Sequence, residues 1–362
     1  MLPKGSKIGI LGGGQLAQML ASAARGLDYE CYIYTDNKDS CCTGVVESTL
    51  GSFHNVEKLR KFIDSVDVVT YETENLDLYK LDRYDKIKPS IVALGHTQNR
   101  AYENALLYSM GIKKAEHTGV ICMSNITKTL NEFGFPLIIK SCRGGYDGKN
   151  QWLCRSPEDV DKFIETDGYG VFDKIHPFQF IAERVLDFKQ EISAIAVRDE
   201  HGNFGFYDTV ATFHENGILR RAEIPADISP VVDIQAKDIV ERIANRLQYV
   251  GVLCVEFFLM ENDDLYVNEI APRVHNSGHW TVEASRTSQF ENHIRAICGM
   301  ELGDTWTTSK AELINLLTLD DLGEKLDMGY LNSKDYIVTL YGKKAPKKGV
   351  RKLGHITKLI RD

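Results

Sequence analysis

The chain has 362 residues, 43% of them hydrophobic, which is more than one hydrophobic core usually organises, so we expect two or three domains. Its formal net charge of -8 comes from acidic and basic residues that are interspersed along the chain rather than collected in a tail. This pattern argues against a protein that binds nucleic acid or a membrane surface by bulk electrostatic attraction.

The eight cysteines are scattered, form no CxxC pair and lie in several cases inside apolar runs. Such thiols are typical of a reducing compartment, so we expect neither a disulfide nor a zinc site. The apolar stretch near the start is short and broken by glycines, and no later run approaches the ~20 residues of a membrane span. We therefore expect a cytoplasmic protein that does not bind membranes.

The first hundred residues alternate between predicted strands and helices. A helical pattern begins at Gln15, directly after three glycines, and another begins after Thr97. The predicted strands are residues 7–11, 31–35, 67–72 and 91–95. This alternation indicates a parallel α/β layer, which we end near residue 100.

The rest of the chain is typical of two-layer α+β structure. The predicted strands are residues 119–123, 136–140, 151–154, 178–183, 191–197, 205–213, 252–260 and 265–270, with one more within 334–344. Helices are predicted at residues 126–133 and 233–249, and a hairpin turn at 200–203. The expected division is an N-terminal Rossmann-like domain (1–100), a central domain (101–299) and a small C-terminal domain (300–362).

Two glutamates stand out in the strand pair at 252–260 and 265–270. If the connecting loop is residues 261–264, Met260 lies opposite Leu265, and counting back places Glu256 opposite Glu269. Directly opposed residues have Cβ atoms only ~4.5–5.5 Å apart, and like charges there destabilise a sheet. A Mg²⁺ ion with oxygen ligands would neutralise them, and Asn268 could add an oxygen. The alternative is that one glutamate points to solvent or meets an arginine.

A lysine and a glycine-rich loop precede this pair. Lys140 ends a predicted strand, and RGGYDGK follows at residues 143–149. Glycines let backbone N–H groups approach phosphate oxygens, and Lys149 adds a mobile charge, although the loop does not match the Walker pattern and could be a plain turn. Downstream, Glu183 and Glu191 flank a short connector whose backbone could bind adenine while a carboxylate holds ribose; they could equally be surface glutamates.

Lys140, RGGYDGKNQ, AERVLDFKQEIS, VEFFL and VNEIAPR resemble the ATP-grasp superfamily, in the right order, over roughly residues 100–300. GGGQLAQM, YETEN, QNR, FHENGIL, NEIAPRVHNSGHWT and RKLGH resemble the 5-(carboxyamino)imidazole ribonucleotide synthase family of purine biosynthesis. The resemblance implies an ATP-grasp fold behind an N-terminal Rossmann-like (pre-ATP-grasp) parallel-sheet domain, with a small C-terminal domain that completes the acceptor site.

The same resemblance implies a carbon–nitrogen ligase. ATP phosphorylates bicarbonate to carboxyphosphate, the amine of aminoimidazole ribonucleotide captures the carboxyl group, and ADP and phosphate are released. It also implies Mg²⁺, for which Mn²⁺ can substitute, and a homodimer. Such chemistry needs a closing lid and fixed cations, because carboxyphosphate is easily lost to water.

The resemblance assigns site residues position by position. Those implied to contact ATP are Arg100, Lys140, Gly145, Tyr146, Asp147, Gly148, Lys149, Gln151, Glu183, Arg184, Val185, Leu186, Glu191, His214, Asn268 and Glu269. Those implied to bind the other substrates are Gln15, Glu74, Tyr146, Asp147, Arg273, His275, Lys343, Arg351 and Lys352. The implied catalytic residues are Lys140, Lys149, Arg273, His275 and Asn276, and the metal ligands are Glu256 and Glu269.

Two positions depart from the family pattern: Asn150 stands where the loop commonly has a second glycine, and Ala17 stands where the N-terminal motif usually has glycine. Neither is a proposed ligand. We expect Asn150 to stiffen the lid and Ala17 to affect helix packing more than chemistry.

Three other functions compete with this interpretation. Gly12, Gly14 and Ala17, followed by Asp36, fit the dinucleotide fingerprint of a nicotinamide-dependent oxidoreductase. That function gives no reason for the glutamate pair, so we interpret the glycines as a strand-to-helix turn whose helix N-terminus faces the substrate phosphate. A related ligase that uses glycinamide ribonucleotide and formate, and a non-catalytic binding protein, are the other two alternatives.

Overall fold

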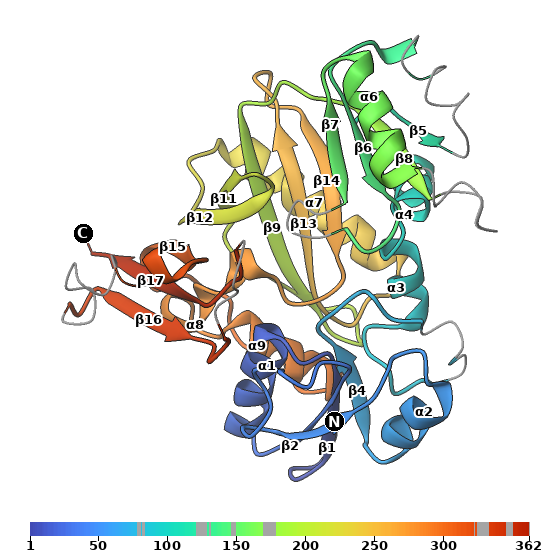
Figure 1. Cartoon of the computed structure of the whole chain (residues 1–362). Coiled ribbons are helices and arrows are strands. Elements are labelled where there is room, and N and C mark those ends of the chain that lie inside the picture. The colour runs from blue at the N-terminus through green and yellow to red at the C-terminus, as the bar shows by residue number, and fades with distance from the viewer. Residues whose placement is uncertain are drawn as a thin grey trace.

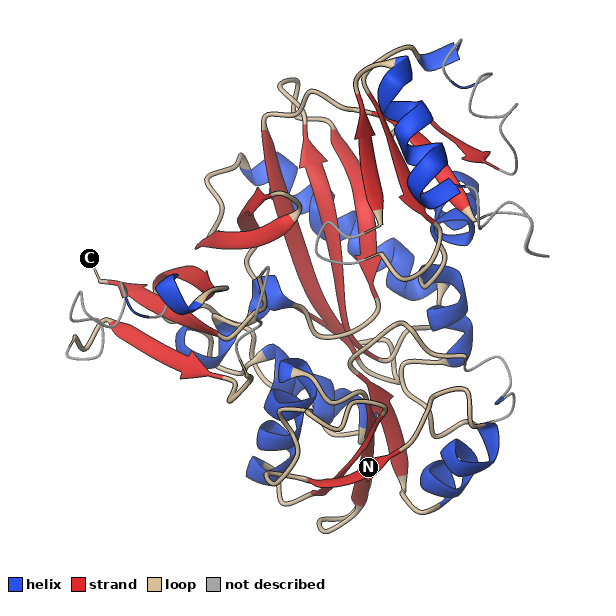
Figure 2. Cartoon of the chain, viewed as in Figure 1, coloured by secondary structure: helices blue, strands red, loops and turns tan. Residues whose placement is uncertain are grey.

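The computed structural model describes residues 1–77, 81, 84–120, 129, 132–145, 150–168, 179–321, 323, 333–344 and 350–361. Within them the strands form three sheets, which Figure 1 shows with the N-terminal sheet at the bottom and the strands of the C-terminal segment at the left. Figure 2 shows that the largest sheet runs through the middle of the molecule, with helices packed beside it.

The N-terminal sheet confirms the predicted parallel layer. Its strands are β1 (Lys7–Leu11), β2 (Glu30–Thr35), β3 (Glu47–Leu50) and β4 (Val68–Tyr71), paired in the order β3-β2-β1-β4. All three pairings are parallel. Its helices are α1 (Gln15–Gly26) and α2 (Val56–Asp64). Strand β1 and helix α1 lie in one buried apolar cluster, which includes Ala17.

The prediction of a strand at residues 91–95 is wrong. These residues belong to helix α3 (Ile91–Thr97), which begins where the Ser90 hydroxyl accepts a hydrogen bond from the Ala93 N–H at 3.2 Å. A short apolar run fits a buried helix as well as a strand, and a serine in front of it favours the helix. Helix α4 (Arg100–Ser109) follows at once, capped by Asn99.

A small antiparallel sheet lies at the upper right of Figure 1. Its strands are β5 (His117–Val120), β6 (Leu137–Ser141), β7 (Gln151–Cys154) and β8 (Phe180–Arg184), in the order β5-β8-β6-β7. Helix α6 (Pro157–Phe163) and a π-helical turn (Ile164–Gly168) cover it. The predicted helix at 126–133 lies largely outside the described residues.

In the part of the chain that the structure describes, the central sheet has nine strands. These are β9 (Gln190–Arg198), β10 (Phe204–Phe206), β11 (Val210–Glu215), β12 (Ile218–Ile224), β13 (Gly251–Leu259), β14 (Leu265–Ala271), β15 (Lys310–Leu316), β16 (Tyr336–Leu340) and β17 (Gly354–Ile360). Their order is β14-β13-β9-β11-β12-β15-β17-β16, with β10 paired to β9. The C-terminal strands therefore extend the same sheet through β12, and the domain boundaries near residues 100 and 300 remain predictions.

The predicted single strand at 205–213 is interrupted between β10 and β11: the Tyr207 N–H still donates to the Ile195 carbonyl of β9 at 3.0 Å, but the chain then has one extra residue before the pairing resumes. Both strands pair with β9, but at different places: Phe206 lies opposite Ala196 and Val210 opposite Ser193. Between them the buried Tyr207 donates a hydrogen bond from its hydroxyl to the Thr287 carbonyl at 3.0 Å. A distant side-chain contact of this kind leaves no periodic signal in the sequence.

The remaining helices pack against the central sheet and against the N-terminal domain. They are α7 (Pro230–Arg246), a 3-10 turn (Asn276–Gly278), α8 (Thr281–Ala284) and α9 (Gln289–Ile297). Helix α7 begins three residues before its predicted start, because Ser229 caps it and Pro230 fits its first turn. Residues of α1 and α9, including Leu20 and Ile294, share one buried cluster, which joins the first domain to the second.

None of the helices in the described part of the chain is long and apolar enough to cross a membrane. All seven cysteines that the structure describes are free and buried.

A buried histidine connects the N-terminal domain to the central sheet. The Val252 N–H donates to His293 Nδ1 at 3.0 Å, and Nε2 lies 2.7 Å from the Thr70 hydroxyl, so the ring proton lies on Nε2. Burial lowers the pKa of His293 to about 3. The ring is therefore neutral in the folded protein.

His293 should make the protein less stable as the pH falls from about 6.5, the ordinary histidine pKa, towards 3. The unfolded chain binds a proton in that window and the folded chain does not, which costs up to about 1.4 kcal/mol per pH unit. Urea unfolding between pH 7 and 5 should show a smaller loss for His293→Gln than for the parent. His96→Gln, at an exposed position on helix α3, is the control and should keep the parent's slope. Equal slopes for His293→Gln and the parent would contradict the assignment.

Candidate active site

Glu256 on β13 and Glu269 on β14 lie directly opposite each other, as predicted. The counting that led there was wrong, since Leu259, not Met260, pairs with Leu265. A β-bulge between Glu256 and Phe257 compensates for the shift, because Val267 pairs with Phe257 and leaves Asn268 as the extra residue of β14. The predicted opposition of Glu256 and Glu269 is confirmed, but it depends on a bulge that the sequence did not reveal.

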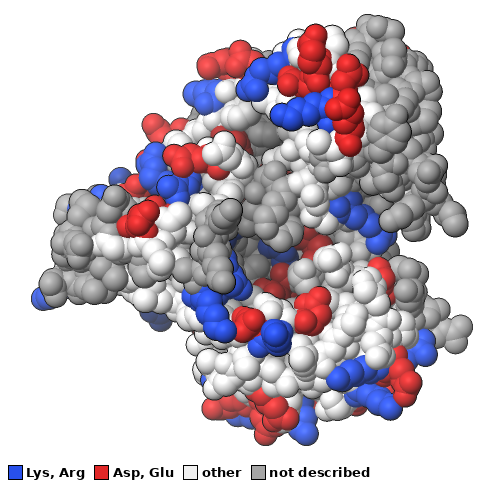
Figure 3. Space-filling view, in the orientation of Figure 1, with Lys and Arg blue, Asp and Glu red and all other residues white. Residues whose placement is uncertain are grey.

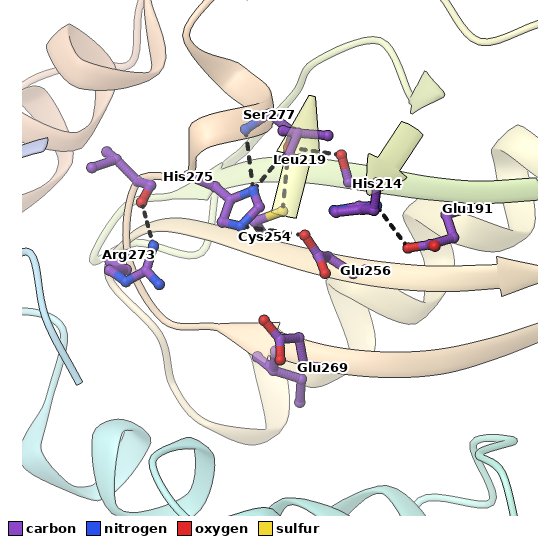
Figure 4. Close-up of polar contacts among 12 residues, drawn as sticks. Glu191, His214, Leu219, Cys254, Glu256, Glu269, Arg273, His275 and Ser277 are labelled. Carbon is purple, nitrogen blue, oxygen red and sulfur yellow. Dashed lines mark hydrogen bonds and ion pairs between the residues drawn. The ribbon is translucent and has the colours of Figure 1, made fainter. Parts of the chain in front are cut away.

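The two carboxylates have different surroundings. Burial and, to a smaller extent, the nearby Glu269 together raise the pKa of Glu256 to about 7. Burial also acts on Glu269, but the Arg100 guanidinium, 3.1 Å from its Oε2, outweighs that effect and lowers the pKa of Glu269. Figure 4 shows Glu256 between Glu269 and the His275 ring, whose Nε2 lies 3.3 Å from Glu256 Oε1.

This pair fits a divalent cation held jointly by protein and substrate. No group of three or more His, Cys, Asp or Glu side chains among the described residues could hold a metal ion without other ligands. Mg²⁺ needs no such group, because it characteristically takes one or two carboxylates and completes its shell with phosphate oxygens and water. Burial and the opposing Glu269 raise the pKa of Glu256, and a cation between the two carboxylates would offset this repulsion.

A cavity of ≈ 330 Å³ opens on one side of the pair and gathers most of the residues assigned to ATP. Its assigned members are Arg100, Lys140, Gln151, Glu183, Arg184, Val185, Leu186, Glu191, His214, Asn268 and Glu269. The Lys140 ammonium lies 2.5 Å from Glu183 Oε2, and both side chains are buried. Burial raises the pKa of Glu183, but Lys140 outweighs it and lowers that pKa to about 2, so Glu183 is a carboxylate that holds Lys140.

The other wall of this cavity is flat and apolar. Phe188 and Phe258 stack with ring centroids 4.6 Å apart and both line the cavity. Arg184, at the start of the connector, turns its guanidinium outward to Glu116 at 2.8 Å, so it can face a ligand only through its backbone. An aromatic wall beside backbone donors and acceptors suits a purine base. The sequence interpretation missed the two phenylalanines, because each also fits an ordinary strand.

His214 and Glu191 both line this smaller cavity, and His214 lines the larger one as well. His214 Nδ1 is 2.9 Å from Glu191 Oε2, and Figure 4 shows the two side chains pointing toward each other from β11 and β9. Burial lowers the pKa of His214, but Glu191 outweighs it and the net pKa is raised. This pair therefore favours a positive charge close to Glu256.

A larger cavity of ≈ 880 Å³ opens on the other side of the carboxylate pair. Figure 3 shows a hollow in this face, around which acidic and basic side chains gather. The assigned residues that line it are Gln15, Glu74, Arg100, Gly145, His214, Glu256, Glu269, Arg273, His275, Asn276, Lys343, Arg351 and Lys352. The N-terminal domain, the central sheet and the C-terminal segment each contribute a wall.

Two polar contacts connect these walls. Arg273 Nε lies 2.9 Å from Glu74 Oε1, and the Lys343 ammonium donates a hydrogen bond to Gln15 Oε1. Arg100, His214, Gly217, Glu256 and Glu269 line both cavities. The two cavities therefore meet at the carboxylate pair.

The segment after β14 is held by side chains that the sequence interpretation did not single out. Gln289 accepts from the His275 N–H at 3.0 Å and donates to the His275 carbonyl at 2.6 Å. The Ser277 N–H donates to His275 Nδ1 at 3.3 Å, so the ring proton lies on Nε2 and faces Glu256. Burial, with Arg273 nearby, lowers the pKa of His275 well below its usual value, so the ring is neutral.

Asn276, next along this segment, is free to bind a ligand. Its side chain is buried and lines the larger cavity, yet neither amide atom has a partner among the residues that the structure describes. A buried amide without partners is costly, so a bound group is expected to satisfy it.

The glycine turn of the N-terminal domain is already occupied. Glu72, just after β4, accepts a hydrogen bond from the Gly14 N–H at 2.7 Å, and a Cβ at Gly12 would lie 2.4 Å from the Glu72 side chain. A carboxylate therefore fills the N-terminus of α1, where a dinucleotide would place its pyrophosphate. Our expectation that this helix end faces the substrate phosphate remains a prediction, since the glycine turn also lines the larger cavity. The position of Glu72 at a strand end was the available signal.

The glycine-rich loop is described only at its two ends. Tyr146, Asp147, Gly148 and Lys149 lie outside the described residues. Asn150 has a φ of +57°, the left-handed region that glycine favours, and its Nδ2 donates to the Gly144 carbonyl at 3.1 Å. The asparagine thus closes the base of the loop at the position where the family commonly has glycine.

Two family models match the chain: a ribonucleotide synthetase preATP-grasp domain over residues 5–98 and an ATP-grasp domain over residues 105–290. The N5-carboxyaminoimidazole ribonucleotide synthase of Bacillus subtilis is 36% identical over 357 residues, which cover 98% of this chain and 91% of that protein. The synthase of the same name from Brucella melitensis is 37% identical over 362 residues, covering 99% and 97%.

Solved structures give the same result. N5-carboxyaminoimidazole synthetase from Staphylococcus aureus, complexed with ADP, has a TM-score of 0.90 at 32% identity and covers 100% of this chain and 95% of that one. The Aspergillus clavatus synthase in complex with ADP and 5-aminoimidazole ribonucleotide has a TM-score of 0.86 at 29% identity, covering 99% and 94%. The resemblance and the fold class inferred from the sequence are confirmed, and the oxidoreductase alternative is wrong. The chain belongs to the N5-carboxyaminoimidazole ribonucleotide synthase family and is an ATP-dependent ligase with the ATP-grasp fold.

Proposed function

We propose that this chain carboxylates 5-aminoimidazole ribonucleotide, with ATP and bicarbonate as the other substrates and N5-carboxyaminoimidazole ribonucleotide, ADP and phosphate as products. The observation that carries the proposal is the meeting of two cavities at Glu256 and Glu269. One cavity has a purine-sized apolar slot and buried cations, and the other is a large polar chamber. A reaction that passes a phosphoryl group from a nucleotide to a small anion needs this arrangement.

The nucleotide would lie with its base between the connector 184–186 and the Phe188–Phe258 wall. Its phosphates would then extend past Lys140 towards Arg100 and the carboxylate pair, which places the γ-phosphate where the cavities meet. Lys140 and Arg100 supply fixed positive charge for the transferring phosphoryl group. Mg²⁺ held by Glu256, Glu269 and the phosphates would neutralise further charge there. Lys149, with Tyr146, Asp147 and Gly148, would close over the phosphates as a lid.

Bicarbonate and the acceptor amine would meet in the larger cavity. Arg273 and the unpartnered Asn276 amide can bind the oxygens of bicarbonate and carboxyphosphate next to the γ-phosphate position. Neutral His275, with its proton on Nε2, orients Glu256. Glu74 and Gln15 can hold the ribonucleotide, and Lys343, Arg351 and Lys352 its phosphate.

Three further expectations belong to this proposal and rest on the family resemblance. Mn²⁺ should replace Mg²⁺, the protein should be a homodimer, and it should work in the cytoplasm without nucleic acid or membrane partners.

The purified protein should release ADP from ATP only when both bicarbonate and 5-aminoimidazole ribonucleotide are present. A coupled ADP assay measures this, with glycinamide ribonucleotide plus formate as the comparison and NADH absorbance as the test for hydride transfer. ADP release with glycinamide ribonucleotide and formate, but not with the proposed pair, would reject the acceptor assignment.

Glu269→Gln should lower Mg²⁺-dependent turnover on the order of 100-fold, as for the loss of one electrostatic group at a transition state. The amide keeps the shape and can still accept a hydrogen bond from Arg100, so circular dichroism should report an intact fold. Glu261→Gln, in the exposed turn between the same strands, is the matched control and should behave as the parent. Normal activity of Glu269→Gln at low Mg²⁺ would show that the ligand is wrongly assigned.

Lys343→Met should raise the KM for the ribonucleotide about tenfold, as expected for a lost charge-assisted hydrogen bond, and leave the KM for ATP unchanged. The neighbouring Lys344, paired with Asp39 at 2.8 Å and 83% exposed, offers a matched control in Lys344→Met. Initial-rate kinetics with each substrate varied in turn measure the split. An equal rise in the KM for ATP, or an equal rise in the KM for the ribonucleotide in Lys344→Met, would show that Lys343 does not bind the acceptor.

A further inference from the structure

The bulge in β14 decides which side chains face the nucleotide. Consecutive residues of a regular strand point to opposite faces of the sheet, so Asn268 and Glu269 should diverge. Both nevertheless line the nucleotide cavity, because Asn268 is the extra residue between the pairs Val267–Phe257 and Glu269–Glu256. The bulge is therefore required for Asn268 and Glu269 to face the nucleotide cavity together.

A bulge interrupts the ladder of hydrogen bonds, and β14 is also the edge strand of the central sheet, so its outer groups lack a neighbouring strand. A segment from outside the sheet supplies the missing partners. The Lys114 ammonium donates to the Asn268 carbonyl at 2.9 Å, and Glu103 Oε2 accepts from the Ile270 N–H at 3.0 Å. These two contacts lie on either side of Glu269.

Lys114 and Glu103 are joined to each other beneath the bulge. The Lys114 ammonium lies 2.8 Å from Glu103 Oε1, and the two side chains are only 5% and 2% exposed. Just before Lys114, the Lys113 carbonyl accepts from the Val267 N–H at 2.9 Å, so the backbone pairs with the edge of β14 directly ahead of the bulge. The Lys114–Glu103 ion pair therefore lies next to the residue at which the bulge interrupts the regular pairing of β14 with β13.

Helix α4 connects this ion pair to the carboxylate itself. Arg100 and Glu103 are three residues apart and share a face of the helix. Arg100 donates to Glu269 Oε2 at 3.1 Å, while Glu103 holds the backbone of the next residue, Ile270. One helix face therefore fixes both the side chain of Glu269 and the peptide that follows it.

We propose that Glu103 and Lys114 are positioning residues that hold the β14 bulge, so that Asn268 and Glu269 both face the nucleotide and its metal ion. The inference rests on the proposed nucleotide site but not on the identity of the acceptor. Each acts through the backbone of β14. Glu103 also lines the larger cavity, but its two carboxylate oxygens are held by the Lys114 ammonium and the Ile270 N–H. Their loss should therefore weaken binding of Mg·nucleotide and leave acceptor recognition nearly unchanged.

Isothermal titration calorimetry with Mg·ADP tests the proposal without catalysis. Glu103→Gln and Lys114→Met should each weaken Mg·ADP binding by about tenfold or more, and weaken Mg²⁺-free ADP less, since the metal ligand Glu269 is displaced. In kinetics the KM for ATP should rise in parallel, while the KM for the ribonucleotide changes less than threefold. If the parent protein binds Mg·ADP tightly but does not carboxylate the ribonucleotide, the proposed acceptor is wrong. A failure of the proposed function is therefore distinct from a failure of the positioning role.

Two control variants separate positioning from general destabilisation. Lys113→Met removes a neighbouring, half-exposed ion pair with Asp264 and should bind Mg·ADP as the parent does. Leu107→Ala destabilises the same helix through its buried apolar face. At a temperature where it is folded, Leu107→Ala should also keep the parent's Mg·ADP affinity.

If the two test variants are not recovered folded, Glu103→Asp and Lys114→Arg keep the charges but shift the donor and acceptor atoms. These should weaken Mg·ADP binding about threefold. Parental Mg·ADP affinity in the folded test variants, or an equal loss in Leu107→Ala at matched thermal stability, would overturn the proposal.

Discussion

The structure depends on one electrostatic constraint, the placement of two carboxylates directly opposite each other on adjacent strands. Antiparallel pairing brings Glu256 and Glu269 together, and burial removes the water that would otherwise screen them. The Arg100 guanidinium stabilises the charged form of Glu269 and lowers its pKa, whereas the pKa of Glu256 is raised. A nucleotide-bound cation would neutralise the negative charge of Glu256.

Two ion pairs lie on either side of Glu256 and Glu269 and join the neighbouring elements. Lys140 and Glu183 join two strands of the small sheet at one side, and Arg273 and Glu74 join the central sheet to the N-terminal domain at the other. In each case a buried cation is held by a carboxylate, so the cation remains fixed before substrate arrives. Fixed charges of this kind stabilise a transferring phosphoryl group without reorganising during the reaction.

Much of the fold and of the site could be predicted from the sequence, and the errors have specific causes. Strands such as β1, β6 and β13 were recognisable because their apolar residues include β-branched ones and are bounded by glycine, proline or polar turn residues. The run at 91–95 was misassigned because four apolar residues followed by a glycine do not distinguish a strand from a helix. The glutamate pairing came out right although the loop was miscounted, because a bulge shifts the register and cannot be counted from the sequence. Glu72 was overlooked because its partner is a backbone N–H 58 residues away.

The sequence by itself determined the order of the strands and helices and the set of charged residues that a nucleotide-dependent ligase needs. Local patterns record these, since periodicity and strand ends are properties of neighbouring residues. Only the tertiary structure decided which charges are paired and which face a cavity. No local pattern singled out Lys114 and Glu103, whose partners are known only once the edge of β14 lies against them. Burial and opposition of groups far apart in the chain set their pKa values, and no local pattern contains that information.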